Sequence, residues 1–392
     1  MNYQKTINAC FIGYIVQAIV NNFAPLLFLT FQRQYEIPLS WITLLVTINF
    51  LIQLLVDLLS VKFLDRIGYR TALIAAHIFA SAGLLSLTIL PDIIPGHFLG
   101  LLLSVCIYAL GGGLLEVLLS PVVEACPTDN KEKAMSLLHS FYCWGHMAVV
   151  LISTLFFTAF GIENWKFAAW FWAMIPAVNG LLFANAPIAP LIEEGHEAMS
   201  FRQLASSGLF WLFFLMMFCS GASEQAVSQW ASTFAEQGLG ISKTMGDLAG
   251  PMSFALFMGT ARTLYGKYGE RIHLTHCMIG SGILCVISYL CISLIPNPVI
   301  GLMGCALCGF SVGIMWPGTF SIASKAMPTG GTALFAMLAL GGDLGCSGGP
   351  TLAGFISSLS GDNLRLGILS AVFFPILLTA GVIAIQKKRP AS

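Results

Sequence analysis

Long apolar stretches separated by short polar connections follow one another along nearly the whole chain. A helix that spans the hydrocarbon core of a bilayer needs about 20 mostly apolar residues. Twelve stretches meet this requirement: 7–30, 42–61, 71–90, 98–123, 135–160, 166–188, 208–233, 248–265, 273–294, 298–323, 332–358 and 366–386. None shows the apolar–polar alternation of a transmembrane strand. Because a helix satisfies its own backbone hydrogen bonds in lipid, the pattern predicts an all-α integral membrane protein with twelve transmembrane helices.

The composition supports a membrane environment. Of the 392 residues, 57% are hydrophobic and 9% are charged, whereas a soluble domain has about 45–50% apolar and about 25% charged residues. The formal net charge of zero gives no basic face for a nucleic-acid partner. Nearly all of the 11 cysteines lie in apolar stretches, where a free thiol packs as a small hydrophobe. Since Cys305 and Cys308 have no second pair, we expect no metal site and no cofactor.

The distribution of basic residues favours one orientation in the membrane, because cytosolic loops carry an excess of Lys and Arg. With the N-terminus in the cytosol, 14 of the 18 Lys and Arg residues fall at or near the cytosolic side. The other four are Arg33, Lys166, Lys243 and Arg365. An even number of spans returns the C-terminus to the same side. We therefore expect a multi-pass protein of the cell (plasma) membrane with both termini cytosolic.

The chain divides into two halves that repeat weakly. The longest predicted cytosolic connection, 189–207, separates an N-terminal six-helix half (1–188) from a C-terminal six-helix half (208–392). A shift of 201 residues places Gly68 on Gly269, Arg70 on Arg271, Gly112 on Gly313, Pro127 on Pro328 and Thr128 on Thr329. Two parallel six-helix repeats with a binding site near the bilayer midplane are a known plan of secondary transporters.

The connection after the second apolar stretch reads VKFLDRIGYR, residues 61–70. It resembles the signature loop of the major facilitator superfamily, G-x-x-x-D-R-x-G-R-R, with Asp65, Arg66, Gly68 and Arg70 in place. Val61 and Tyr69 depart from that pattern, and residues 262–271 echo it in the second half. The resemblance implies the twelve-helix major facilitator fold and a cytosolic latch at this loop, in which Gly68 permits a tight turn.

We expect a set of charged and turn residues to form the cytosolic gate. In this hypothesis, carboxylates and basic side chains at the helix ends pair when the cytosolic side is closed. The set comprises Asp57, Asp65, Arg66, Gly68, Arg70, Glu124, Arg262, Arg271 and Lys325. The alternative is a solvated, positively charged turn, with Glu124 and Lys325 as simple surface charges.

The fourth apolar stretch resembles the corresponding segment of the fucose-permease-like sugar:proton symporters within this superfamily. It reads GGGLLEVLLSP, residues 111–121, where a Glu follows a Gly-rich stretch and precedes a small residue and a Pro. The paired Asn21 and Asn22 and residues 138–141 extend the resemblance, which implies sugar transport coupled to protons. Pro25 stands where that branch has an acidic residue implicated in proton coupling. Coupling must therefore use another group, or the protein is not a symporter of that kind.

Five ionisable residues other than His lie inside the predicted spans: Asp57, Glu116, Glu224, Arg262 and Asp343. A buried charge costs about 2.5–3.5 kcal/mol on insertion scales, and such groups usually face a cavity or a partner. We expect proton coupling from Glu116, the leading candidate, and from Glu224 and Asp343. The expected substrate contacts are Asn21, Asn22, Glu116, Glu224, Gln225, Gln229, Trp230 and Trp316. For each, the alternative is packing or a hydrogen bond between helices.

These observations favour a secondary active transporter that moves a small hydroxylated solute, a monosaccharide, together with protons by alternating access. The alternatives are an efflux carrier for amphipathic small molecules and an uncoupled facilitator. No arrangement of catalytic residues is present, so we expect no enzyme. The expected partners are the solute, protons (with Na⁺ as the other coupling ion to consider) and the lipid bilayer, and we expect a functional monomer. The identity of the solute and the direction of transport stay open at this stage.

Overall fold

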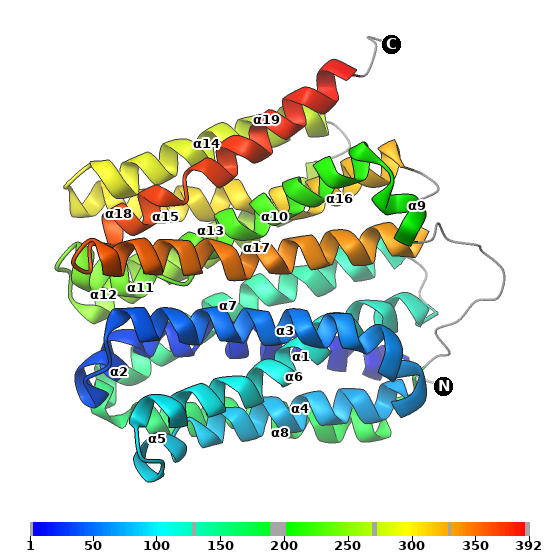
Figure 1. Ribbon diagram of the computed structural model, residues 1–392. Coiled ribbons are helices and arrows are strands. Elements are labelled where there is room, and N and C mark those ends of the chain that lie inside the picture. Colours follow the sequence, from blue (N-terminus) through cyan, green and yellow to red (C-terminus); the bar gives the residue numbers. More distant parts are fainter. Residues whose placement is uncertain (1–2, 128–130, 189–200, 269–272, 328–330, 389–392) are drawn as a thin grey trace. The chain divides into compact units, whose positions relative to one another are not determined.

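The computed structural model describes residues 3–127, 131–188, 201–268, 273–327 and 331–388 (Figure 1). The described residues contain helices and no strands. The chain forms two compact units, Met1–Glu194 and Gly195–Ser392. Each unit contains six long helical segments, so the predicted fold class is confirmed.

The first unit contains the following helices. The first span consists of α1 (Gln4–Asn22), a 3₁₀ turn η1 (Ala24–Leu27) and α2 (Phe28–Tyr35). The second to sixth spans are α3 (Leu39–Ile67), α4 (Tyr69–Ser86), α6 (His97–Ala125), α7 (Lys131–Phe160) and α8 (Trp165–Asn185). The short segments α5 (Leu90–Ile93) and η2 (Ile162–Asn164) precede α6 and α8.

The second unit begins with the short helix α9 (Phe201–Ala205), which lies in the connection predicted at 189–207. Its first span consists of α10 (Gly208–Ser228), α11 (Ala231–Thr233) and a π-helical turn η3 (Phe234–Gly238). The next span consists of α12 (Lys243–Asp247), a π-helical turn η4 (Leu248–Met252) and α13 (Ser253–Tyr268). The remaining spans are α14 (Leu274–Leu294), α15 and α16 (Pro298–Val312, Met315–Ala326), α17 (Gly331–Leu359), and α18 and α19 (Leu364–Ser370, Phe373–Lys388).

The same helix pairs pack together in both units. In the first unit, α1 packs on α7, α3 on α6, and α4 on both α6 and α8. In the second unit, the equivalent pairs are α10 with α17, α13 with α15, and α14 with both α15 and α19. The weak sequence repeat therefore corresponds to a repeat of helix packing, in agreement with the resemblance described above.

The outer surface of the helices is apolar, as expected for a protein surrounded by lipid. Nine stretches of the described residues are long and apolar enough to cross a membrane. Large apolar side chains such as Leu181 and Leu359 are 71% and 69% exposed. Water would disfavour so many exposed apolar groups, whereas lipid tails solvate them.

Several spans are interrupted, and two of the breaks bear on the site. In the first span, Pro25 lies in the 3₁₀ turn between α1 and α2, since proline has no amide hydrogen to donate within a helix. The span continues to Tyr35, past the predicted end at residue 30. In the fourth span of the second unit, α15 ends at Val312 and α16 begins at Met315. This break leaves the carbonyl of Gly313 available to a side chain, as described below.

Candidate functional site

A buried glutamine and a carboxylate meet inside the first unit. Gln17 of α1 is buried, and its side-chain amide Nε2 donates to Glu116 Oε2 of α6 at 3.0 Å. The other polar atom of the same side chain, Gln17 Oε1, is buried and has no hydrogen-bond partner among the described residues. Because buried acceptors are normally satisfied, this oxygen can accept a hydrogen bond from a donor that enters the site.

Further polar side chains extend this cluster towards α7. The Tyr14 hydroxyl and Ser120 Oγ are 3.0 Å apart, one helical turn from Gln17 and Glu116 respectively. The Tyr14 ring also meets the edge of His139 of α7, with ring centroids 5.3 Å apart. Residues spaced by three or four lie on one face of a helix, so α1 presents a polar face to α6 and α7.

The paired Asn residues of α1 point to different neighbours. Asn22 Nδ2 donates to the Ala18 carbonyl at 2.9 Å and to the Tyr142 hydroxyl of α7 at 3.3 Å. Asn21 Oδ1 accepts from Gln53 Nε2 of α3 at 2.8 Å and from Asn49 Nδ2 of the same helix at 3.3 Å. Asn22 therefore shares a helix interface with the cluster around Tyr14, whereas Asn21 holds α1 against α3.

An ion pair lies inside the second unit. Arg262 Nη2 of α13 is 3.5 Å from Glu224 Oε2 of α10, and the two side chains are 18% and 8% exposed. The guanidinium Nε also donates to the Gly313 carbonyl at 3.3 Å, in the break between α15 and α16. Arg262 thus connects three spans. The sequence placed Arg262 with the gate and Glu224 with the substrate, and the structure brings them together.

A chain of carboxamide side chains continues from Glu224 along its helix. Gln225 Nε2 donates to Glu224 Oε1 at 3.4 Å, and Gln229 Nε2 donates to Gln225 Oε1 at 3.0 Å. Both Gln side chains are buried. Carboxamides offer a donor and an acceptor in one group, which is the pattern that a sugar hydroxyl matches.

The remaining predicted site residues of the second unit have these positions. Trp230 is fully buried, and its indole N–H donates to the Pro350 carbonyl of α17 at 2.9 Å. Trp316 of α16 is half-buried; its ring packs on Gly342 of α17 and meets Phe320 at 6.3 Å between centroids. Asp343 follows Gly342 and is buried. A substrate-stacking role for either Trp stays a prediction.

A second buried ion pair was not expected from the sequence. Asp247 is 1% exposed on its side chain, and Lys243 Nζ lies 2.8 Å from Asp247 Oδ2. Ser232 Oγ donates to the same carboxylate at 2.5 Å. From the sequence, Lys243 is expected only to lie on the outer side of the membrane. The spacing of four residues places Lys243 and Asp247 on one face of α12, which was the available signal.

The predicted gate residues are only partly described. Gly68, the single residue between α3 and α4, has a φ of +82°, which suits glycine. Arg70 Nη1 donates to the carbonyls of Phe183, at 3.3 Å, and of Ala184 in the last turn of α8. This contact satisfies carbonyls that a helix end leaves unpaired. Asp57 lies half-buried in α3.

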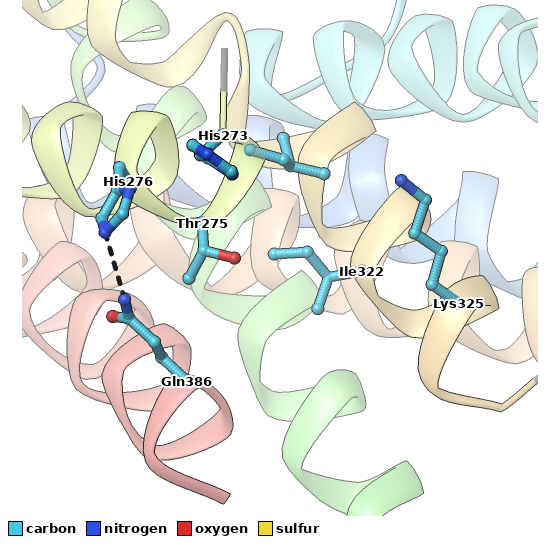
Figure 2. A pocket seen from close by; sticks show the side chains of 7 residues that line it. His273, Thr275, His276, Ile322, Lys325 and Gln386 are labelled. Atoms are coloured by element: carbon cyan, nitrogen blue, oxygen red, sulfur yellow. Dashed lines mark hydrogen bonds between the residues drawn. The ribbon is translucent and has the colours of Figure 1, made fainter. Parts of the chain in front are cut away.

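The other gate residues have these positions. Asp65, Arg66 and Glu124 lie in helices, but their side chains are outside the described part of the chain, as is the whole of Arg271. Lys325 lies in the last turn of α16 and lines a cavity together with residues of α14 and α19 (Figure 2). The gate role of all these residues stays a prediction.

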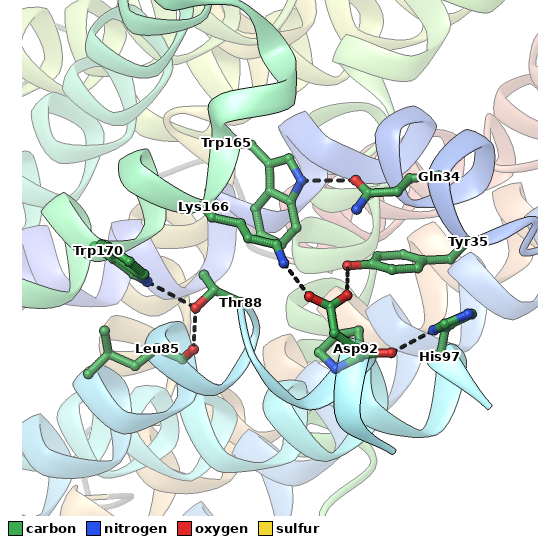
Figure 3. A network of polar contacts seen from close by, with 10 residues as sticks. Gln34, Tyr35, Leu85, Thr88, Asp92, His97, Trp165, Lys166 and Trp170 are labelled. Carbon is green, nitrogen blue, oxygen red and sulfur yellow. Dashed lines mark hydrogen bonds and ion pairs between the residues drawn. The ribbon is translucent and has the colours of Figure 1, made fainter. Parts of the chain in front are cut away.

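The end of the first unit away from Gly68 is held by a polar network (Figure 3). Asp92 forms an ion pair with Lys166 of α8 and accepts from the Tyr35 hydroxyl of α2 at 3.1 Å. Trp165 Nε1 donates to Gln34 Oε1 at 3.1 Å. These contacts join the end of the first span to the start of the sixth through α5.

Both clusters consist of side chains that donate and accept hydrogen bonds. The described residues contain no group of three or more His, Cys, Asp or Glu placed to hold a metal ion.

Sequence reasoning missed Gln17, Tyr14 and Tyr142, although Gln17 precedes Asn21 by four residues and therefore shares its helix face.

Comparison with known proteins agrees with this description. A family model described as Major Facilitator Superfamily matches residues 9–350. No curated protein matches the chain by sequence. The crystal structure of the E. coli fucose:proton symporter FucP has a TM-score of 0.67 at 15% identity, covering 98% of this chain and 99% of FucP.

Two other solved transporters share the fold. A bacterial homologue of the human lysosomal transporter Spinster, inward-facing and unoccupied, has a TM-score of 0.76 at 12% identity, covering 100% of this chain and 99% of the homologue. The nucleoside transporter NupG has a TM-score of 0.74 at 12% identity, covering 97% of this chain and 99% of NupG. Because the family model spans most of the sequence and these transporters share its fold, the chain belongs to the major facilitator superfamily, a family of multi-pass membrane transporters.

Proposed function

We propose that this transporter moves a small hydroxylated solute, a monosaccharide, together with protons by alternating access. The observation that carries the proposal is the pair formed by Gln17 and Glu116, in which a carboxylate and an unsatisfied acceptor lie side by side inside the first unit. A sugar hydroxyl can donate to Gln17 Oε1. The carboxyl group beside it can take up or release the proton that travels with the solute.

The first unit supplies a proton carrier in this proposal, because Glu116 is hydrogen-bonded to the neutral amide of Gln17. A carboxylate accepts from the amide N–H, and a protonated carboxyl still accepts from it through its carbonyl oxygen. Both protonation states therefore have a hydrogen bond to Gln17. Pro25 occupies the position of the acid in the resembling branch, so Glu116 takes the coupling role in this proposal.

Glu224 has a different environment, because Arg262 compensates its charge. Loss of one partner of a buried ion pair leaves an uncompensated charge. We therefore assign Glu224 to holding Arg262 and to ordering the Gln225 and Gln229 carboxamides, which contact the solute. Asp343 remains the third candidate for coupling.

The proposal includes the membrane and the orientation inferred from the basic residues. The protein lies in the plasma membrane with both termini in the cytosol and functions as a monomer. Its partners are the solute, protons and lipid, and no catalytic step, cofactor or metal is involved. FucP, a fucose:proton symporter with the same fold, supports a sugar as the solute class. NupG, a nucleoside transporter, makes a nucleoside the first solute to test beside the sugars.

The test uses purified protein in proteoliposomes and a panel of monosaccharides and nucleosides, with external pH as the readout. Addition of the right sugar should cause external alkalinisation, because protons enter with it. Glu116→Gln should abolish this response. The matched control is Glu163→Gln, which removes one carboxylate at an exposed position before α8 and should leave the response intact.

Two other outcomes favour the alternatives. Uptake of a sugar without any pH change would support an uncoupled facilitator, for which Pro25 is the supporting residue. Absence of a response to the whole panel would contradict the sugar proposal and favour an efflux carrier for amphipathic compounds.

A further inference from the structure

The second unit has a cavity of about 250 Å³, whose lining side chains are shown in Figure 2. It is formed by the start of α14, the end of α16 and the end of α19. The lining residues are His273, Leu274, Thr275, His276, Ile322, Lys325 and Gln386. None of the side chains proposed to contact the solute contributes to it.

The polar lining of the cavity is basic. His273 and His276 stand with their ring centroids 5.7 Å apart and their planes at 83°. His276 Nε2 is 3.2 Å from Gln386 Nε2, so a hydrogen bond between a side chain of α14 and one of α19 forms part of the cavity wall. Lys325 comes from α16 and is exposed, and no acidic side chain is among the lining residues in the described part of the chain. In the sequence, another basic residue, Lys387, directly follows the lining residue Gln386.

The backbone at the start of α14 adds further donors. Leu274, Thr275 and His276 are the first three residues of this 21-residue helix, and the side chain of the N-cap residue His273 makes no capping hydrogen bond. The first amide N–H groups of a helix have no partner within the helix, and they carry partial positive charge. Three basic side chains, His273, His276 and Lys325, therefore line one concave space together with the first turn of α14. Phosphate is the group whose charge and several acceptor oxygens match such a set of donors.

We propose that this cavity binds a phosphate group, carried either by the headgroup of an anionic lipid or by a soluble phosphate compound. The helix ends that form it belong to the side predicted to be cytosolic, where membranes expose anionic lipids and where basic pockets bind their headgroups. Bound phosphate would join the ends of α14, α16 and α19. The cavity thus provides a phosphate-binding site separate from the solute-binding residues, and this proposal holds whether or not the solute is a sugar.

The test measures the thermal unfolding midpoint of the purified full-length protein in neutral detergent. Three additions are compared: phosphatidylglycerol, phosphatidylcholine, and sodium phosphate against sodium chloride at equal ionic strength. A ligand that binds the folded state raises the midpoint as its concentration exceeds its dissociation constant. The variants are His273→Gln with His276→Gln, and Lys325→Gln alone. The control is Lys5→Gln, which removes an exposed positive charge outside the cavity.

The expected result is that phosphatidylglycerol, but not phosphatidylcholine, raises the midpoint of the wild-type protein and of Lys5→Gln. Both cavity variants should need roughly tenfold more phosphatidylglycerol for the same rise, because each loses hydrogen-bond donors to the phosphate. An equal rise with sodium phosphate alone would identify a soluble phosphate compound as the source. Equal responses in the wild type and in both variants, or no response to either phosphate source, would overturn the proposal. If the double His variant does not fold, Lys325→Gln decides the result, because Lys325 is exposed.

Discussion

Gln17 and Glu116 are 99 residues apart in the sequence and are joined at 3.0 Å between α1 and α6. The amide that donates to the carboxylate has its own oxygen buried without a hydrogen-bond partner among the described residues. One side chain therefore holds the carboxylate and offers an acceptor to a second molecule. This relationship is the basis for linking proton movement to solute binding in the first unit.

Glu116→Gln should separate coupling from solute exchange. The substituted amide keeps the shape of the side chain and can still bond to Gln17, but it cannot exchange a proton. We expect uphill uptake driven by a proton gradient to fall to background, while exchange of labelled for unlabelled solute across the membrane is partly retained. Counterflow and gradient-driven uptake in the same proteoliposomes measure the two activities. Gradient-driven uptake at the wild-type rate would remove Glu116 from the mechanism.

Gln17→Leu tests the acceptor directly. The substitution preserves approximate volume while removing both the donor to Glu116 and the unsatisfied oxygen. A single hydrogen bond contributes about 0.5–1.5 kcal/mol, so we expect the KM for the solute to rise by roughly 3- to 10-fold. Initial uptake rates as a function of solute concentration provide the measurement. Gln4→Leu is the control because Gln4 is exposed near the start of the same helix, and an unchanged KM in Gln17→Leu would contradict the assignment.

The ion pair between Glu224 and Arg262 should show strong coupling in a double-mutant comparison. Arg262→Gln leaves the buried Glu224 carboxylate uncompensated and removes the contact with the Gly313 carbonyl. Breaking a buried pair in this way costs about 3–5 kcal/mol. We expect a lower thermal midpoint for Arg262→Gln, and partial recovery when Glu224→Gln is added because both charges are then gone. Midpoints of the two single variants and the double variant in detergent give the result, and additive losses would exclude a direct pair.

The twelve spans could be predicted because each helix that crosses the bilayer needs an apolar stretch of matching length in the sequence. The predicted stretch 332–358, for example, differs by one residue at each end from α17. The breaks were not predicted. Pro25 was considered only as a missing acid, although its lack of an amide hydrogen also explains the 3₁₀ turn. The π-helical turns near residues 234–238 and 248–252 left no clear pattern in the sequence.

The sequence could not identify the interaction partners of the charged residues within the membrane spans. Glu224 and Arg262 are 38 residues apart, and their pairing depends on how α10, α13 and α15 pack. Gln17 was missed because a neutral amide in an apolar stretch is a weak signal until its neighbour is known. Candidate residues could be identified from charge and position, whereas their connections required the packing of the helices.

The close packing of α10 and α17 should make Gly345 sensitive to substitution. A Cβ at this position would overlap the Phe218 carbonyl of α10, which cannot move without shifting the helix. Small residues allow membrane helices to approach closely in this way. We expect Gly345→Val to lower stability by about 1–3 kcal/mol, as overpacking usually does. Gly280→Val is the control, since a Cβ on Gly280 meets no atom within 4 Å. Equal thermal midpoints for the two variants would contradict the predicted close approach.

The pair of Asp92 and Lys166 should make stability fall in acid. The hydrogen bond that Lys166 donates to Asp92 is the main reason that the pKa of Asp92 lies below its ordinary value of 3.8. A carboxyl whose pKa is lower in the folded state binds fewer protons there than when unfolded, so its stabilising contribution is complete above that ordinary value. The contribution is lost as pH falls below 3.8 through the lowered pKa of the folded state. The contribution of the ion pair to stability should be small because both side chains are partly exposed and salt screens them.

The thermal midpoint of the wild type should therefore approach that of Asp92→Asn as the pH is lowered from 6 towards 3 at low ionic strength. A difference between the two proteins that stays constant over this range would show that the ion pair does not stabilise the fold.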